Sequence, residues 1–193
     1  MARAARRLKT ASRGNLPALV LMTDDGRLAD PLAAACALPR GSMIVVRARD
    51  DTRRKTLSAA LLKIARRHGL AVIIADDPEL TARLGADGIH LSEMRAGEAA
   101  HWRTRFPALL ITTSAHSLRA VLKAQNLPVD AIFLSPVFPT LSHPDRASLS
   151  PLRAMSIARA SRRAVYALGG IDSRNAARLC GFVGIAAIGA LEA

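Results

Sequence analysis

The stretch MIVVRARDDTRRKTLSAALLKIARRHGLAVIIADDPELTARLGADGIHL, residues 43–91, decides the fold. Its apolar runs are MIVV (43–46), LAVIIA (70–75) and GIHL (88–91). These runs are continuous rather than alternating and rich in Val, Ile and Leu, which is typical of strands covered on both faces in a parallel sheet. Amphipathic, arginine-bearing segments at 52–69 and 78–85 separate them. The stretch therefore predicts the order strand, helix, strand, helix, strand.

The segment 52–69 is the clearest helix of the chain. Leu57, Leu61 and Ile64 recur at spacings of three and four residues, so they line one face of a helix. Gly69 follows His68 at the position where a glycine commonly ends a helix in the left-handed conformation. We expect the helix to end there.

The same alternation continues in both directions from this stretch. The other apolar runs lie at 19–22, 109–113, 130–134, 164–168 and 184–188, and the other helix candidates at 95–106, 117–126, 150–160 and 173–181. Eight strands interleaved with helices predict an α/β protein with a single (β/α)8 TIM barrel. An open doubly wound sheet is the alternative. No glycine-rich turn follows the run at 19–22, which disfavours the dinucleotide-binding version of that sheet.

The length of 193 residues bounds the domain organisation. It suits one domain, which we place at 15–193, and it is short for a barrel of this kind. We therefore expect a compact barrel whose last helix is short or missing. Residues 1–14 are basic and form an N-terminal tail or a leading helix. A missing helix leaves apolar barrel surface, so a homo-oligomer or coverage by residues 1–14 is expected.

Composition and charge restrict the function classes. Half of the residues are hydrophobic, which is enough for a sizeable core, and no apolar stretch is long enough to span a membrane. The two cysteines form neither a disulfide framework nor a metal cluster, so we expect a cytoplasmic protein without a membrane partner. The net charge of +13 suits phosphorylated small molecules, nucleic acid or solvated arginines. Scarce aromatic residues argue against nucleic acid.

Polar residues that follow the predicted strands are the candidates for a site, because functional groups of such barrels gather at the carboxyl ends of the strands. Arg47 and Arg49 follow the run at 43–46 and suit a phosphate or diphosphate; two exposed arginines are the alternative. Asp76 and Asp77 suit Mg²⁺ on phosphate oxygens, whereas a helix cap before Pro78 is the alternative that we favour.

The last four strands add further candidates. Ser114 and His116 end the fifth strand, where a histidine suits proton transfer or a purely structural hydrogen bond. Gly169 and Gly170 precede the helix candidate at 173–181, and Gly189 follows the eighth strand. Glycines there allow backbone N–H groups to approach a phosphate at a helix start, and tight turns are the alternative. The residues of the long loop after the sixth strand that carry polar or turn chemistry are Ser135, Pro139, Thr140 and His143.

Together these motifs resemble the thiamin phosphate synthase family, which includes the related thiazole tautomerases. The segments that carry the resemblance are GADGIHLSE (85–93), TTSAHS (112–117), DAIFLSPVFPT (130–140) and YALGGIDSRNAARLCGFVGIAAIGAL (166–191). The resemblance implies a (β/α)8 barrel that binds a phosphorylated thiazole between the loop after the sixth strand and the glycines of the seventh and eighth strands. It also implies thiamin biosynthesis as the setting.

In the synthase, a pyrimidine diphosphate loses pyrophosphate with the help of Mg²⁺, and the thiazole nitrogen captures the pyrimidine. The resemblance implies that Arg47 binds the diphosphate, that Arg49 stands where the family has lysine, and that Asp76 is one Mg²⁺ ligand. The residues implied in catalysis or in binding the thiazole phosphate are Ser114, Ser135, Pro139, Thr140, Gly169, Gly170 and Gly189.

The chain also departs from the synthase pattern. Val45 replaces a glutamine, Ala75 replaces an asparagine, Arg95 stands at the second metal aspartate, and His143 stands at an expected lysine. A cation at a metal position repels Mg²⁺, so we expect a degenerate pyrimidine diphosphate and Mg²⁺ site. The half that binds the phosphorylated thiazole is intact.

This asymmetry favours a divergent protein that resembles thiamin phosphate synthase and acts on a phosphorylated thiazole without the full synthase machinery, with tautomerisation as the expected reaction. A tautomerase of the family needs no Mg²⁺ and moves a proton with a histidine, which would be His116 here. A true Mg²⁺-dependent synthase is the close rival, if Asp76, Asp77 and Glu93 rebuild a metal site. A non-catalytic binder of a thiamin precursor and a nucleic-acid binder that uses residues 1–14 are the remaining alternatives.

Overall fold

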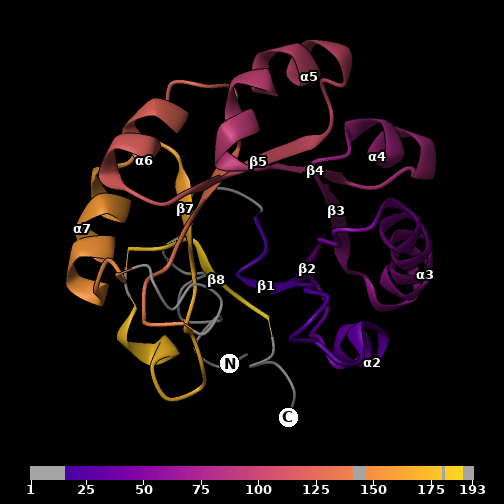
Figure 1. Cartoon of the computed structure of the whole chain (residues 1–193), viewed down its shortest axis with the longest axis horizontal. Helices are drawn as coiled ribbons and strands as arrows, with labels where there is room; N and C mark the ends of the chain where they lie inside the picture. Colours follow the sequence, from indigo (N-terminus) through magenta and orange to yellow (C-terminus); the bar gives the residue numbers. More distant parts are fainter. Residues whose placement is uncertain (1–15, 141–146, 180, 189–193) are drawn as a thin grey trace.

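Eight parallel strands form a closed barrel in the computed structural model, which describes residues 16–140, 147–179 and 181–188 (Figure 1). Neighbours in the chain are neighbours in the barrel, and β8 pairs with β1 to close it. The strands are β1 (Leu19–Met22), β2 (Met43–Val46), β3 (Ala71–Ala75), β4 (Gly88–Leu91), β5 (Leu110–Ala115), β6 (Ala131–Leu134), β7 (Ala164–Leu168) and β8 (Gly184–Ala187). The predicted barrel and all eight predicted strands are confirmed.

Helices follow most of the strands and surround the barrel (Figure 1). They are α2 (Pro31–Cys36), α3 (Asp51–His68), α4 (Pro78–Leu84), α5 (Ala99–Arg105), α6 (Leu118–Ala124) and α7 (Pro151–Ala160), with 3-10 helices η1 (Glu93–Glu98) and η2 (Ala176–Arg178). The sequence patterns did not predict α2, which is short and begins at the Asp30 cap. The predicted tail at 1–14 and any helix after β8 lie outside the described residues.

The end of α3 at Gly69 is as predicted, whereas its cap at Asp50 was not predicted from the sequence. The Asp50 side chain accepts a hydrogen bond from the Arg53 N–H at 2.7 Å at the start of α3, and Gly69 ends it with a φ of 64°. Asp77 caps α4 in the same way, since its Oδ1 accepts from the Leu80 N–H at 3.0 Å. The predicted cap at this aspartate is confirmed.

The helix predicted at 173–181 is wrong. The structure has only the single 3-10 turn η2 among the described residues of that segment. The Asp172 carboxylate accepts from the Arg174 N–H at 2.8 Å and the Asn175 N–H at 3.0 Å, and the Asn175 amide donates to the Gly170 carbonyl oxygen at 2.8 Å. The Asp172 bonds are those of a helix cap, but the backbone becomes extended at Leu179 (φ −90°, ψ 124°), so the turn does not continue as a helix.

Two layers of apolar side chains form the core. One lies between the strands and the helices, and the other fills the inside of the barrel with alternate residues of the strands. Inside the barrel, the rings of Phe133 and Tyr166 stack with their centroids 4.7 Å apart. The Tyr166 hydroxyl donates to the Pro17 carbonyl oxygen at 2.7 Å, so the one polar atom of that ring has a partner. None of the described helices is both long and apolar enough to cross a bilayer.

We predict that Tyr166→Phe lowers the free energy of unfolding by about 1 kcal/mol, because it removes this bond and leaves the Pro17 carbonyl oxygen unpaired. Denaturant unfolding followed by circular dichroism measures the change. Leu152→Ala, at a side chain that is 76% exposed, is the control and is expected to change stability little. Equal stability of Tyr166→Phe and the wild type would contradict the prediction.

Candidate functional site

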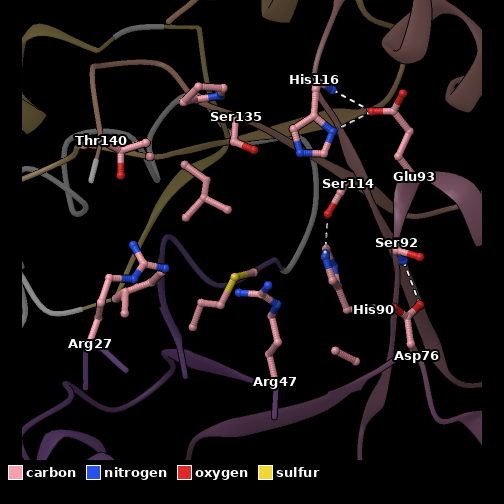
Figure 2. A pocket seen from close by; sticks show the side chains of 17 residues that line it. Arg27, Arg47, Asp76, His90, Ser92, Glu93, Ser114, His116, Ser135 and Thr140 are labelled. Atoms are coloured by element: carbon pink, nitrogen blue, oxygen red, sulfur yellow. Dashed lines mark hydrogen bonds and ion pairs between the residues drawn. The ribbon is translucent and has the colours of Figure 1, made fainter. Parts of the chain in front are cut away.

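A cavity of about 340 Å³ lies at the carboxyl ends of the strands (Figure 2). Its apolar wall includes Met22, Ala75 and Leu168, the last residues of β1, β3 and β7. The polar side chains that line it are Arg27, Arg47, Asp76, His90, Ser92, Glu93, Ser114, His116, Ser135 and Thr140. The structure thus brings together most of the site residues predicted from the sequence.

Two arginines stand on the β1 and β2 side of the cavity (Figure 2). Asp24 holds both, because its Oδ2 accepts from Arg27 Nη2 at 3.0 Å and from Arg47 Nη1 at 3.1 Å. The bond from Arg27 is the main cause that lowers the pKa of the Asp24 carboxyl. One carboxylate therefore fixes two guanidinium groups side by side, an arrangement that suits phosphate oxygens.

Arg49 does not line the main cavity. It lies with Arg47 in a smaller neighbouring hollow that Asp24 and Asp25 also line, and its backbone N–H donates to Asp25 Oδ2 at 2.8 Å. Strand β2 ends at Val46, so both arginines lie beyond the strand. The rule that residues two apart in a strand point to the same side therefore does not apply to Arg47 and Arg49.

A histidine and a carboxylate face each other on the opposite side. Glu93 Oε2 lies 2.6 Å from Nδ1 of His116 and also accepts from the His116 backbone N–H at 2.8 Å (Figure 2). His116 follows β5, whereas Glu93 begins η1. The two bonds fix the ring and direct Nδ1 to the carboxylate, which leaves Nε2 available for proton transfer.

A second histidine lies deeper in the barrel. His90 of β4 is 4% exposed, and its ring nitrogens lie 2.9 Å from the hydroxyl oxygens of Thr112 and Ser114. Burial lowers the pKa of His90 to about 4, with the charge of Asp76 opposing this change. The ring is therefore uncharged at neutral pH.

The surroundings of Asp76 do not fit a divalent metal. Asp76 Oδ1 accepts from the Ser92 N–H at 2.8 Å and lies 3.9 Å from Arg95 Nη1, which also donates to the Asp76 carbonyl oxygen. Glu98 holds the Arg95 guanidinium through two bonds of 2.7 and 2.8 Å, and this pairing lowers the pKa of Glu98 to about 2. A fixed cation thus stands beside the predicted metal ligand.

The carboxylate of Asp77, the next residue, also has partners. Asp77 caps α4 with Oδ1, and its Oδ2 lies 3.4 Å from Arg54 Nε. Within the described ranges, no group of three His, Cys, Asp or Glu side chains is placed to hold a metal ion. The donor set fits Mg²⁺ poorly, because Mg²⁺ needs free oxygen ligands and here the facing group is a guanidinium.

The loop after β6 closes the cavity against the end of β7. Val137 N–H donates to the Leu168 carbonyl oxygen and Phe138 N–H to the Gly169 carbonyl oxygen, both at 3.0 Å. Gly170, with a φ of 65°, lies so close that a Cβ there would stand 2.3 Å from the Pro139 carbonyl oxygen. Gly170 therefore has a steric reason to be glycine, whatever binds in the cavity.

The remaining predicted residues fall in three groups. Ser135, Thr140, Gly169 and Gly170 line the cavity, and Pro139 packs behind it on Gly170. His143 and Gly189 lie outside the described residues. Three further polar lining residues, Arg27, His90 and Ser92, were not predicted as site residues from the sequence. The signal for Arg27 was its place in the loop after the first strand.

A family model described as thiamine monophosphate synthase matches residues 19–191. The chain belongs to the thiamine monophosphate synthase family. The predicted resemblance is therefore confirmed, and the matched residues span all eight strands.

Individual relatives support this family assignment. The chain is 36% identical over 146 residues to a thiamine-phosphate synthase of Thermus thermophilus, with 72% of this chain and 68% of the relative covered. It is 35% identical to the enzyme of that name from Chromobacterium violaceum, with 87% and 83% covered. Among solved structures, thiamine phosphate pyrophosphorylase from Pyrococcus furiosus superposes with a TM-score of 0.74 at 23% identity and covers 93% of this chain and 89% of its own. That structure supports the fold.

We predict that Gly170→Ala lowers the free energy of unfolding by roughly 2 kcal/mol or more, because it combines a strained φ with overlap on the loop backbone. Gly85→Ala is the matched control, since Gly85 has a φ of 63° with nothing within 4 Å of its would-be Cβ. Its loss is expected to be about 1 kcal/mol. Chemical denaturation measures both variants, and equal losses would show that the close approach to Pro139 has no cost.

Proposed function

We propose that the protein is a thiamine-phosphate-synthase-like transferase of thiamin biosynthesis, and that it binds a phosphorylated thiazole in the cavity at the carboxyl ends of the strands. The observation that carries the proposal is the cavity itself. It unites the arginine pair at Arg27 and Arg47 with the loop residues Ser135 and Thr140. The names of the curated relatives support the same reaction class.

In this reaction the C–O bond to the diphosphate breaks and a C–N bond to the thiazole forms, so negative charge develops on the leaving group. Arg27 and Arg47 are fixed by Asp24 before the ligand arrives. Such preorganised donors stabilise developing charge without moving at the moment of reaction. The apolar strand ends, including Met22 and Leu168, exclude water from the reacting carbon.

Mg²⁺ is the cofactor that the family implies, and it would neutralise the diphosphate. Because Arg95 stands beside Asp76, the residues at this position do not fit the ion. The protein's own contribution to charge neutralisation comes from its arginines.

We predict that the protein forms thiamin phosphate from the pyrimidine diphosphate and the phosphorylated thiazole, and that a chelator reduces the rate less than tenfold. Mass spectrometry of the product, with and without added Mg²⁺ and EDTA, measures both quantities. Complete loss of product with EDTA would mean that a metal site forms despite Arg95. No product from folded protein would reject the transferase.

The arginine pair gives a sharper test of the binding site. Arg47→Gln is expected to weaken binding of a phosphorylated substrate by about ten- to a hundredfold, because a charge-assisted hydrogen bond contributes about 1.5–3 kcal/mol. Arg105→Gln, which breaks a surface ion pair with Glu79 away from the cavity, is the matched control. Isothermal titration calorimetry measures the affinity. Equal affinities of the two variants would show that the phosphate group does not bind at Arg47.

A second function, thiazole tautomerisation, has one observation in its favour, the pair formed by His116 and Glu93 at 2.6 Å. In this reaction the imidazole removes a proton from one carbon of the thiazole and returns it at another. Glu93 orients the ring through its hydrogen bond to Nδ1.

If this second function operates, His116→Gln abolishes proton exchange into the thiazole carboxylate phosphate, whereas binding of that ligand changes little. Glu93→Gln is expected to lower the exchange rate by about tenfold or more, because it replaces the carboxylate that orients the imidazole ring. Exchange from D₂O, followed by NMR, measures the rate. Wild-type exchange in His116→Gln would remove this function, and binding without either reaction would indicate a non-catalytic binder.

A further inference from the structure

His90 links two strands at the floor of the cavity, which its side chain lines. It lies on β4, and both of its hydrogen-bond partners, Thr112 and Ser114, lie on β5 (Figure 2 labels His90 and Ser114). The edge of the Phe133 ring packs on its imidazole with the centroids 4.9 Å apart. The ring is thus held on three sides, and its orientation is fixed.

The hydrogen bonds around Thr112 determine which ring nitrogen carries the proton. The Thr112 hydroxyl is fully buried and donates to the Ile89 carbonyl oxygen at 3.3 Å. A hydroxyl has one proton, so Thr112 Oγ1 is left to accept, and its donor is Nδ1–H of His90 at 2.9 Å. An uncharged imidazole has only this one proton. Its Nε2 is therefore an acceptor.

The proton that Nε2 accepts is that of Ser114. The Ser114 hydroxyl lies 2.9 Å from Nε2 and also lines the cavity, so its O–H points to the histidine and its lone pairs remain for a ligand. Free serine can donate or accept, because its hydroxyl rotates. Here the four groups in series, from the Ile89 carbonyl to Ser114, remove that freedom.

We propose that His90 is a positioning residue that fixes Ser114 as a hydrogen-bond acceptor, so that this point of the cavity selects an N–H or O–H group of the ligand. This inference rests on the proposed function, because it requires this cavity to be the ligand site. The cavity then has one end that donates hydrogen bonds and one end that accepts them. Arg27 and Arg47 donate to an anion, and Ser114 accepts from a donor on the same ligand or on its co-substrate.

The tautomer can be measured without any ligand. In wild-type protein with ¹⁵N-labelled histidine, NMR at pH 7 is expected to show the proton of His90 on Nδ1 and a bare Nε2. His90→Gln assigns the resonance. A proton on Nε2, or a doubly protonated ring, would overturn the proposal, because Ser114 would then have to accept from the histidine.

Two threonines of β5 provide a matched pair of variants. Thr112→Val removes the partner of Nδ1, and the proton is expected to move in part to Nε2. Thr113→Val makes the same substitution at the next residue of β5. Within the described residues, the one hydrogen bond of the Thr113 hydroxyl goes to the Ser114 carbonyl oxygen, at 3.5 Å, and we expect the tautomer to remain. An unchanged tautomer in Thr112→Val would overturn the chain of hydrogen bonds.

Steady-state kinetics then connects the tautomer to specificity. We expect Thr112→Val to raise the KM of one substrate about tenfold, since Ser114 then presents a donor where an acceptor is required. Thr113→Val is expected to keep the wild-type KM. A KM unaffected by Thr112→Val, together with a changed tautomer, would reject the specificity role. Absence of turnover in the wild type would reject the proposed function and leave the NMR result standing.

Discussion

Hydrogen bonds between β1 and β8 join the two edges of the sheet. Leu19 stands opposite Ile185, and the Ile185 N–H donates to the Ala18 carbonyl oxygen at 3.0 Å. This pairing leaves no open edge among the eight strands and turns all their carboxyl ends toward one cavity. Because the barrel interior is filled by rings such as Tyr166, the cavity has a floor and does not continue as a pore.

Three polar groups of the cavity share one principle of construction, since a neighbouring side chain holds each of them in place. Asp24 holds Arg47, Glu93 holds His116, and His90 holds Ser114. Groups fixed in this way need little reorganisation when a charged ligand binds. Arg95 and Asp76 follow the same principle with a different result, because the guanidinium stands where the family implies a metal.

Much of the fold could be predicted because the signals are local. The continuous apolar runs indicated all eight strands, and Gly69 and Asp77 indicated helix ends, since strand burial and caps depend on residues close in the chain. The helix at 173–181 was wrong beyond a single turn, because the backbone becomes extended at Leu179, whose buried side chain packs in the core.

For the site, the strand order and the motifs were enough to place Arg47, Ser114 and His116 at one end of the barrel. They were not enough to show partners. That Glu93 meets His116, and that Asp24 meets Arg47, depends on the curvature of the closed sheet, which brings separate loops within hydrogen-bond distance. Residue type and spacing fixed which groups reach the cavity, because parallel strands all end on the same side. The pairing among those groups arose from packing between segments far apart in the chain, because hydrogen bonds require contact within about 3 Å and no local pattern encodes that distance.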